Sequence, residues 1–296
     1  MSGAPATIVE WGSSRFAELA ELCATALPDE SLGLDDLEAL CADEHAVVLA
    51  AQDGSGAAVV ALDGSDTSHA GGTGHLHLLV VHPARRRRGT ARALVDAAEA
   101  WAIERGARTM GVGAAAPFYL FSGVDTRWTE ALCLFEALGY ERTEVLLDLS
   151  CPTLQRRRPA PPGVHVEPVR SDAHVEQLVA FSETHYPHWS REFERAGRNG
   201  TAVLAIGPEG EVLGAAAHSV SRLGVVGPVA VRSGGRHGGV GSALMAAVLA
   251  ELAVAGLRTA EISWTSTVGF YAKACGAKVA RASQVHRRAL PGPEQG

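Results

Sequence analysis

Residues 227–245 read GPVAVRSGGRHGGVGSALM, and residues 77–95 read HLLVVHPARRRRGTARALV. Each stretch starts with an apolar strand, turns through an Arg-x-x-Gly-x-(Gly/Ala) sequence and continues into an amphipathic helix. The two copies align at a constant offset of 150 residues without a gap. The chain therefore contains a duplicated functional unit.

The length of the chain fits two domains. Its 296 residues are enough for two domains of about 150 residues, each able to bury its own core. The composition, with 47% hydrophobic and 20% charged residues, is ordinary for a globular protein and far from that of a disordered chain. We therefore expect folded domains throughout.

A change of composition marks the boundary between the halves. Residues 151–163 read CPTLQRRRPAPPG, with four prolines and three consecutive arginines. Such a stretch favours an extended, solvated linker, in which the arginines are a surface feature more often than a phosphate site. We therefore predict an N-terminal domain over residues 1–150 and a C-terminal domain over residues 164–296.

Composition also argues against several classes of protein. Five cysteines, an odd number without a C-x-x-C pair, indicate free thiols rather than a disulfide framework or a zinc site. The N-terminus lacks the regions of a signal peptide, and no apolar run reaches the ~18 residues of a membrane helix. A net charge of -7 makes nucleic acid an unexpected partner. We expect a cytoplasmic protein without a membrane partner or a metal.

The order of the predicted elements also repeats. Each half shows a strand, two helices and three strands, then the helix after the turn, and finally a strand, a helix and a closing strand. The helices after the turns are predicted over residues 89–105 and 239–255, and the closing strands over 142–149 and 278–283. This order predicts a mixed α/β unit with a ligand site where the strand meets the turn.

The turn has the chemistry of an anion site. Gly239 and Gly241 allow the backbone to approach a ligand closely, and the following helix directs its unpaired N–H groups to the same place. The spacing matches neither G-x-x-x-x-G-K-(S/T) nor G-x-G-x-x-G, so the two usual nucleotide motifs are absent. One such turn alone could be a plain helix start, but two gap-free copies favour an anion cradle.

These residues resemble the acetyl-CoA-binding motif of the GNAT N-acetyltransferase superfamily. Downstream, residues 134–140 and 270–277 resemble the later helix motif of that family, which ends in Gly followed by an aromatic or small residue. The resemblance covers roughly residues 9–149 and 165–283. The chain is therefore identified as a tandem GNAT protein, similar in architecture to the mycothiol synthase type.

The resemblance implies a fold of the α/β (α+β) class with two tandem GNAT-like domains. Each domain is then a mixed, mostly antiparallel twisted sheet flanked by helices. It also implies acetyl-CoA as the cofactor, with the pantetheine beside the strand and the pyrophosphate at the N–H groups of the turn. In the second half the implied binding residues are Val229, Ala230, Val231, Arg236, His237, Gly238, Gly239, Val240, Gly241 and Ser242. In the first half they are Leu79, Val80, Val81, Arg86, Arg87, Arg88, Gly89, Thr90, Ala91 and Arg92.

The arginine run at residues 85–88 has two interpretations. With acetyl-CoA bound, it complements the charge of the cofactor phosphates. The alternative is a solvated basic turn or a nucleic-acid patch. The repeat favours cofactor binding.

Acyl transfer from a thioester needs a neutral amine, a donor to the developing oxyanion and a proton for the departing thiolate. The resemblance implies a backbone N–H of the strand as the donor and a tyrosine on the late helix as the acid. Tyr271 matches that position in the second half, whereas Phe135 in the first half has no proton to give. The alternative role for Tyr271 is an aromatic packed under the helix.

The acceptor site is less clearly marked. In the GNAT fold the helices after the first strand cover the acceptor, and here they include residues 183–192, rich in histidine, aromatic and acidic side chains. His185 and His218 are candidate bases, although a single histidine of this kind is more often a surface or packing residue than a base. His185 and His188 have no third ligand at a suitable spacing, so no metal is predicted.

The sequence is best interpreted as an acetyl-CoA-dependent N-acetyltransferase acting by direct attack on a small-molecule or peptide amine. Its second half is the catalytic unit and its first half a degenerate or regulatory copy. Two alternatives remain: a non-catalytic acyl-CoA sensor or scaffold, and an interaction module that has lost the cofactor. The acceptor, the acyl chain length and the choice between monomer and homodimer stay open.

Overall fold

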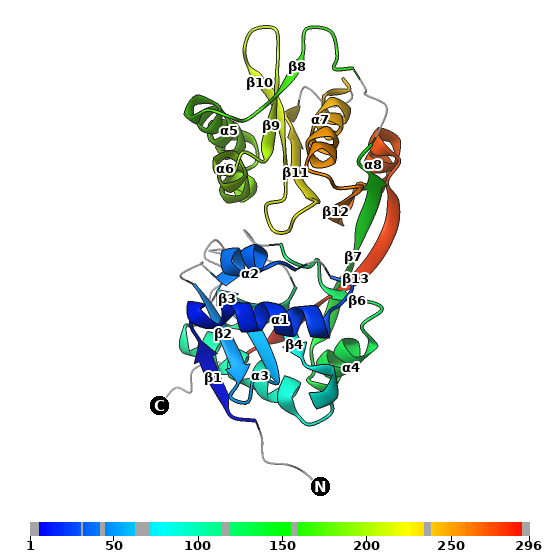
Figure 1. Ribbon diagram of the computed structural model, residues 1–296. Helices are drawn as coiled ribbons and strands as arrows, with labels where there is room; N and C mark the ends of the chain where they lie inside the picture. The colour runs from blue at the N-terminus through cyan, green and yellow to red at the C-terminus, as the bar shows by residue number, and fades with distance from the viewer. Residues whose placement is uncertain are drawn as a thin grey trace. The chain divides into compact units, whose positions relative to one another are not determined.

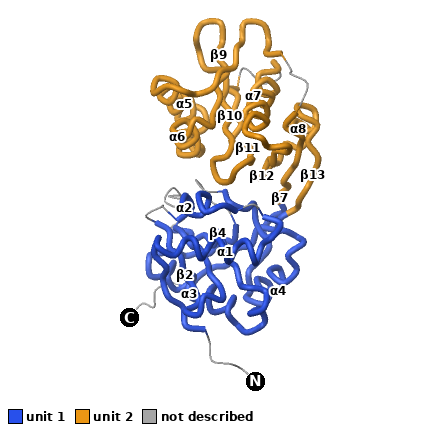
Figure 2. Tube along the Cα trace, in the orientation of Figure 1, with its two compact units in different colours: residues 1–115, 119–145, 283–296 blue, residues 116–118, 146–282 orange. Residues whose placement is uncertain are grey.

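A computed structural model describes residues 6–30, 32–41, 45–62, 72–113, 119–154, 159–233 and 238–291. The chain forms two compact units, which Figure 2 shows in different colours. Unit 1 comprises residues 1–115, 119–145 and 283–296, and unit 2 comprises residues 116–118 and 146–282. The sequence-based boundaries at residues 150 and 164 stay a prediction.

Unit 1 is a sheet flanked by helices (Figure 1). Its strands are β1 (Ile8–Trp11), β2 (Ala46–Ala51), β3 (Gly56–Leu62), β4 (Thr73–Val81), β5 (Thr109–Val112) and the short β6 (Val124–Asp125). Its helices are α1 (Phe16–Ala26), α2 (Leu34–Cys41), α3 (Thr90–Glu104) and α4 (Thr129–Ala137). Strands β1 to β5 pair in sequence order, and only the β4–β5 pair is parallel.

Unit 2 repeats this order of elements. Its strands are β8 (His165–Pro168), β9 (Ala202–Ile206), β10 (Val212–His218), β11 (Val225–Val231) and β12 (Thr259–Thr265). Its helices are α5 (Asp172–His185), α6 (Ser190–Arg198), α7 (Val240–Val254) and α8 (Val268–Cys275). Again the neighbours pair antiparallel, except for the parallel pair β11–β12. The predicted mixed, mostly antiparallel sheet is confirmed.

The helix that follows each turn packs on its sheet through an apolar stripe. In α7 the stripe consists of Leu244, Met245, Val248, Leu249 and Leu252, all buried in the core of unit 2. In α3 it consists of Leu94, Val95, Ala98, Trp101 and Ala102. The i, i+4 spacing that places these side chains on one face is visible in the sequence, so the predictions for both helices are accurate to one residue at each end.

The strand that closes each sheet comes from the other half of the sequence. β7 (Glu141–Pro152) follows α4, yet its residues Leu147–Pro152 pair with β12 in unit 2. β13 (Lys278–Ala289) follows α8, yet its residues His286–Ala289 pair with β5 in unit 1. The closing strands expected at 142–149 and 278–283 therefore exist and are longer than expected. Each contributes residues to both units.

Both sheets open where the parallel pair ends. β4 pairs with β5 over Thr73–Leu76 and then continues to Val81, while β11 pairs with β12 only at Val225 and Val226 and continues to Val231. The remaining part of each strand runs directly into the glycine turn. Among the described residues, no helix has the length and apolar character needed to cross a membrane.

Candidate active site

The turn before α7 has the geometry of an anion cradle. Gly239 precedes the helix in the left-handed conformation, with φ of 91°, which glycine adopts without a steric penalty. No side chain caps the helix in the described residues, so N–H groups of its first turn are available to a ligand. The first turn of α7 begins with Val240, Gly241 and Ser242. The predicted residues Arg236 and His237 lie outside the described residues.

Phe270 explains why the third glycine position of the cradle is occupied by Gly241. A Cβ atom at Gly241 would lie 3.0 Å from Cζ of Phe270 and 3.6 Å from Cγ2 of Val231. The phenyl ring from α8 therefore packs directly against the cradle, although 37% of Phe270 remains exposed. The sequence pattern assigned no role to Phe270, although its place beside Tyr271 in the late helix motif was an available signal.

The cradle of unit 1 has the same backbone form. Gly89 precedes α3 with φ of 88°, again without a side-chain cap. Arg85, Arg87, Arg88 and Arg92 are exposed around it, whereas Thr90 is buried. Four exposed guanidinium groups around a helix N-terminus suit a polyanion.

Arg86 has a contact within the protein instead. Its guanidinium donates to the carbonyl oxygen of Val81 at 3.3 Å and to that of Ala26 at 3.1 Å. It therefore connects the end of β4 to the end of α1. Arg86, one of the residues predicted to bind the cofactor phosphates, thus holds two backbone segments of unit 1 together.

Val231 of unit 2 occupies the position of Val81 in unit 1, and its carbonyl oxygen accepts a hydrogen bond from a different kind of side chain. Tyr186 donates its hydroxyl to the carbonyl oxygen of Val231 at 2.5 Å. The Tyr186 ring stacks on Trp189, with centroids 5.3 Å apart and planes at 17°. The loop between α5 and α6 is thus attached to the strand that leads into the cradle. This contact is between residues 45 positions apart, and no local pattern indicated it.

The predicted pantetheine residues lie on the open part of each central strand. Val229, Ala230 and Val231 pair with β10, and Leu79, Val80 and Val81 pair with β3. On the other side of each strand, the pairing with β12 or β5 has already ended. Backbone groups on that side are therefore free of the sheet and face the opening.

Tyr271 lies on α8, packed against the core of unit 2. Burial raises the pKa of its phenol to about 12, so the side chain keeps its proton at neutral pH. Among the described residues its hydroxyl has no hydrogen-bond partner. The proton is consequently not committed to another group of the described chain.

Phe135 of unit 1 is a core residue. It is 2% exposed and packs edge-to-face on Tyr140 at 5.3 Å. Phe135 stands four residues before Gly139, whereas Tyr271 stands five before Gly276. Because one residue turns a helix by about 100°, the two aromatic side chains differ in direction as well as in chemistry.

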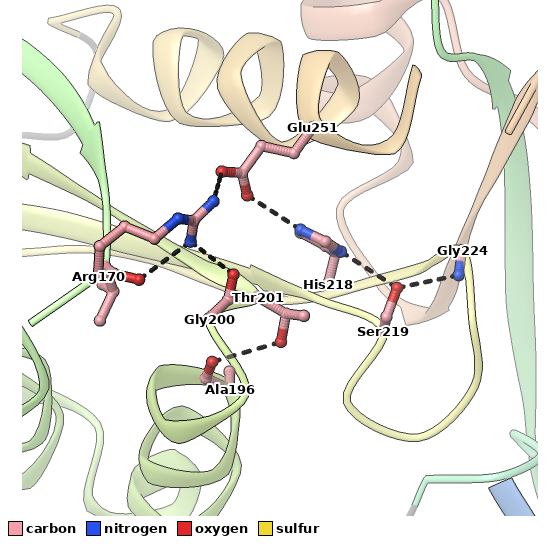
Figure 3. A network of polar contacts seen from close by, with 9 residues as sticks. Arg170, Ala196, Gly200, Thr201, His218, Ser219, Gly224 and Glu251 are labelled. Atoms are coloured by element: carbon pink, nitrogen blue, oxygen red, sulfur yellow. Dashed lines mark hydrogen bonds and ion pairs between the residues drawn. The ribbon is translucent and has the colours of Figure 1, made fainter. Parts of the chain in front are cut away.

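His218 belongs to a polar network on the α7 side of unit 2 (Figure 3). Its Nε2 lies 3.0 Å from Oε2 of Glu251, and its Nδ1 lies 3.1 Å from Oγ of Ser219. Glu251 also pairs with Arg170 at 2.6 Å. Burial acts to raise the pKa of Glu251, but the His218 hydrogen bond and the Arg170 charge outweigh it, so this pKa lies below its usual range.

The predicted catalytic residues are not brought together by hydrogen bonds. His185 is exposed and packs on Phe181, with ring centroids 5.1 Å apart. In the part of the chain that the structure describes, neither His185 nor His218 hydrogen-bonds to Tyr271, and no cluster of potential metal ligands is found. Both ring nitrogens of His218 have hydrogen-bond partners. Within the described part of the chain, the ring of His185 has none.

Comparison with solved structures shows the same fold in other proteins. A GCN5-related N-acetyltransferase from Sphaerobacter thermophilus has a TM-score of 0.71 at 20% identity, over 99% of this chain and 98% of that one. A tandem GNAT protein from the clavulanic acid biosynthesis pathway has a TM-score of 0.72 at 18% identity, over 97% and 99%.

A third similar structure belongs to a much longer protein. The glucosamine N-acetyltransferase region of a fungal multi-domain GH3 beta-N-acetylglucosaminidase has a TM-score of 0.75 at 19% identity. It matches 96% of this chain, and the match spans 38% of the fungal chain. No curated protein matches the sequence.

The sequence itself matches a family model in two segments. The Acetyltransferase (GNAT) family matches residues 14–120 and residues 168–277, one segment in each half and together well over half of the chain. This result agrees with the duplicated strand, turn and helix and with the tandem fold. The chain belongs to the GNAT acetyltransferase family, with two GNAT segments in tandem.

Proposed function

We propose that the protein transfers an acetyl group from acetyl-CoA to a primary amine of a small molecule or peptide, and that the second half carries the reaction. The observation that supports this most strongly is the combination in unit 2 of an uncapped glycine cradle and Tyr271 packed on α8. Unit 1 has a similar cradle but a buried Phe135.

The residues of unit 2 fit acetyl-CoA. N–H groups at Val240, Gly241 and Ser242 suit the pyrophosphate, and the open edge of β11 suits the amide groups of the pantetheine. Acetyl-CoA is the acyl donor and supplies an activated thioester. The same assignment in unit 1 would use Gly89, Thr90 and the exposed arginines.

The protein groups have distinct tasks in the proposed reaction. A neutral amine attacks the thioester carbonyl directly, and backbone N–H groups of β11 stabilise the negative charge on oxygen. Tyr271 donates its proton to the departing thiolate, so that coenzyme A leaves as a thiol. His185 is the preferred candidate for deprotonating the amine because both ring nitrogens of His218 have partners.

A second function is supported by unit 1 alone. A cradle followed by a phenylalanine in the core suits an acyl-CoA sensor or scaffold without chemistry. We therefore propose a degenerate or regulatory role for the first half. The two-domain boundaries, the cytoplasmic location and the state as monomer or homodimer complete the proposal as predictions from the sequence.

The test combines acetyl-CoA titration by calorimetry with an assay for released thiol over a panel of amines. Glucosamine heads the panel because the similar fungal region is described as a glucosamine N-acetyltransferase. Gly239→Glu and Gly89→Glu form a matched pair, because each places bulk and negative charge at one cradle. We expect transfer to disappear with Gly239→Glu and to persist with Gly89→Glu. A wild-type protein that binds no acetyl-CoA would refute the enzyme hypothesis.

A further inference from the structure

A β-bulge interrupts β12 opposite Asp148 of β7. Leu149 pairs with Ile262 and Leu147 pairs with Thr265, so Asp148 alone faces the two residues Ser263 and Trp264. Trp264 has a left-handed backbone, with φ of 52°. This conformation is disfavoured for a bulky side chain and needs support from its surroundings.

The side chain of Asp148 provides that support. Its Oδ1 accepts a hydrogen bond from the backbone N–H of Trp264 at 2.9 Å. Asp148 is only 4% exposed, so water competes little for this hydrogen bond. The carboxylate therefore holds the bulge in place.

The bulge lies where the sheet of unit 2 opens. β12 pairs with β11 at Glu261 and Ile262, and the bulge follows at the next two residues. An extra residue bends a strand and increases its twist, and bulges are common beside active sites for this reason. The bulge thus lies on β12 at the edge of the opening that the proposed mechanism uses.

The same bulge sets the entry into α8. Thr265 Oγ1 accepts the N–H of Thr267 at 3.1 Å, and α8 begins at Val268. Phe270, which packs on Gly241 of the cradle, and Tyr271 follow within the first turn. Figure 1 shows β7 beside β12, and β12 leading into α8. A shift at Trp264 would therefore move both aromatic residues.

We infer that Asp148 is a positioning residue for the acyl transfer, acting through the Trp264 bulge at the edge of the opening on the start of α8. This inference rests on the proposed function. Asp148 belongs to the first half of the sequence but to unit 2 of the fold. The first half consequently contributes to the proposed active site even if its own cradle is idle.

The test is a double-mutant cycle in the full chain. We expect Asp148→Ala to weaken acetyl-CoA binding in calorimetry by about tenfold, because it leaves the buried backbone N–H of Trp264 without its acceptor. Asp148→Asn retains an oxygen acceptor and should stay within about threefold of wild type. Trp264→Gly removes the side chain that makes the left-handed backbone unfavourable. In that background Asp148→Ala should have little further effect.

The outcomes separate this inference from the proposed function. If wild type binds and transfers but Asp148→Ala matches it in affinity and turnover, the positioning role is refuted and the proposed function stands. If wild type neither binds nor transfers, both fail. If Asp148→Ala does not fold on its own, the double variant Asp148→Ala/Trp264→Gly is compared with Trp264→Gly. Equal affinity of these two proteins for acetyl-CoA supports the coupling between Asp148 and Trp264. A further large loss of affinity in the double variant overturns it. Faster amide hydrogen exchange at Trp264 in Asp148→Ala, reversed in Asp148→Asn, is the supporting structural readout.

Discussion

Units 1 and 2 share a cradle but differ in what surrounds it. In both, a left-handed glycine precedes a helix of 15 residues without a side-chain cap. The carbonyl at the end of the central strand accepts from Arg86 in unit 1 and from Tyr186 in unit 2. The late helix directs Phe135 into the core of unit 1, while the corresponding helix of unit 2 carries Tyr271 with an uncommitted proton.

This difference shows that a duplicated binding frame can keep its backbone geometry while its chemistry changes. The cradle depends on main-chain N–H groups and on glycine, which later side-chain substitutions leave intact. Proton donation depends on one hydroxyl in one direction, which a single substitution or a one-residue change in helix length removes.

Removing the hydroxyl group of Tyr271 should produce the largest effect on turnover. We expect Tyr271→Phe to lower kcat by about 10²-fold or more, since general acid catalysis contributes about 10²–10⁴-fold. The affinity for acetyl-CoA in calorimetry should stay within about twofold, because the ring and its packing remain. A variant with unchanged kcat would show that the thiolate leaves without this acid.

The reverse substitution in unit 1 should fail to create a second active unit. Phe135→Tyr places a hydroxyl in a site that is 2% exposed, and burying it without a partner costs about 1–3 kcal/mol. We therefore expect a lower free energy of unfolding in urea and no transfer activity in a protein whose second cradle carries Gly239→Glu. Activity recovered in that background would mean that the two late helices are equivalent.

Substitutions at the third position of the two cradles should affect the two units differently. Gly241→Ala places a methyl group 3.0 Å from the ring of Phe270, so the ring or the helix start must shift, and we expect acetyl-CoA affinity to fall by about three- to tenfold. Ala91→Gly is the control, because it only removes a methyl group from the other cradle. Equal affinity in wild type and Gly241→Ala would show that Phe270 moves without cost.

The smallest effect concerns acid stability in unit 2. Because the pKa of folded Glu251 is lowered, its contribution is present above the unfolded pKa of about 4.3 and is lost as pH falls through the folded value. Glu251→Gln should therefore be less stable than wild type by under about 1 kcal/mol at pH 7, since Arg170 is partly solvated, and the difference should shrink on acidification below pH ~4. Urea unfolding at several pH values measures this.

The control for this measurement is Glu194→Gln. It breaks an exposed pair with Arg198, and such pairs contribute little. A stability difference for Glu251→Gln that does not change with pH would contradict the charge argument and indicate a packing effect.

The pH profile of turnover gives a further check on Tyr271. With its pKa raised to about 12 by burial, the phenol stays protonated throughout the neutral and moderately alkaline range. We therefore expect the kcat of wild type to show no decline between pH 8 and pH 10 from ionisation of Tyr271. The pH profiles of wild type and Tyr271→Phe should then have the same shape in this range. A decline that disappears with this substitution would place the ionisation of Tyr271 lower than its environment predicts.

The local features of this protein were predictable from sequence. Apolar periodicity and the glycine turns located α3 and α7 to within one residue at each end, and the repeated motif predicted the two GNAT segments. These features depend on residues close in sequence, whose spacing determines helix phase and turn geometry. The difference between Tyr271 and Phe135 was visible in the same way.

Only the tertiary structure determined which distant segments meet. The pairing of β7 with β12 and of β13 with β5 joins segments from different halves, and the periodicity of a strand carries no information about its partner. The contacts of Tyr186 with Val231 and of Asp148 with Trp264 depend on that pairing and on helix packing. The sequence alone thus determined the cradle and the family, whereas the groups that surround the cradle were decided by long-range packing.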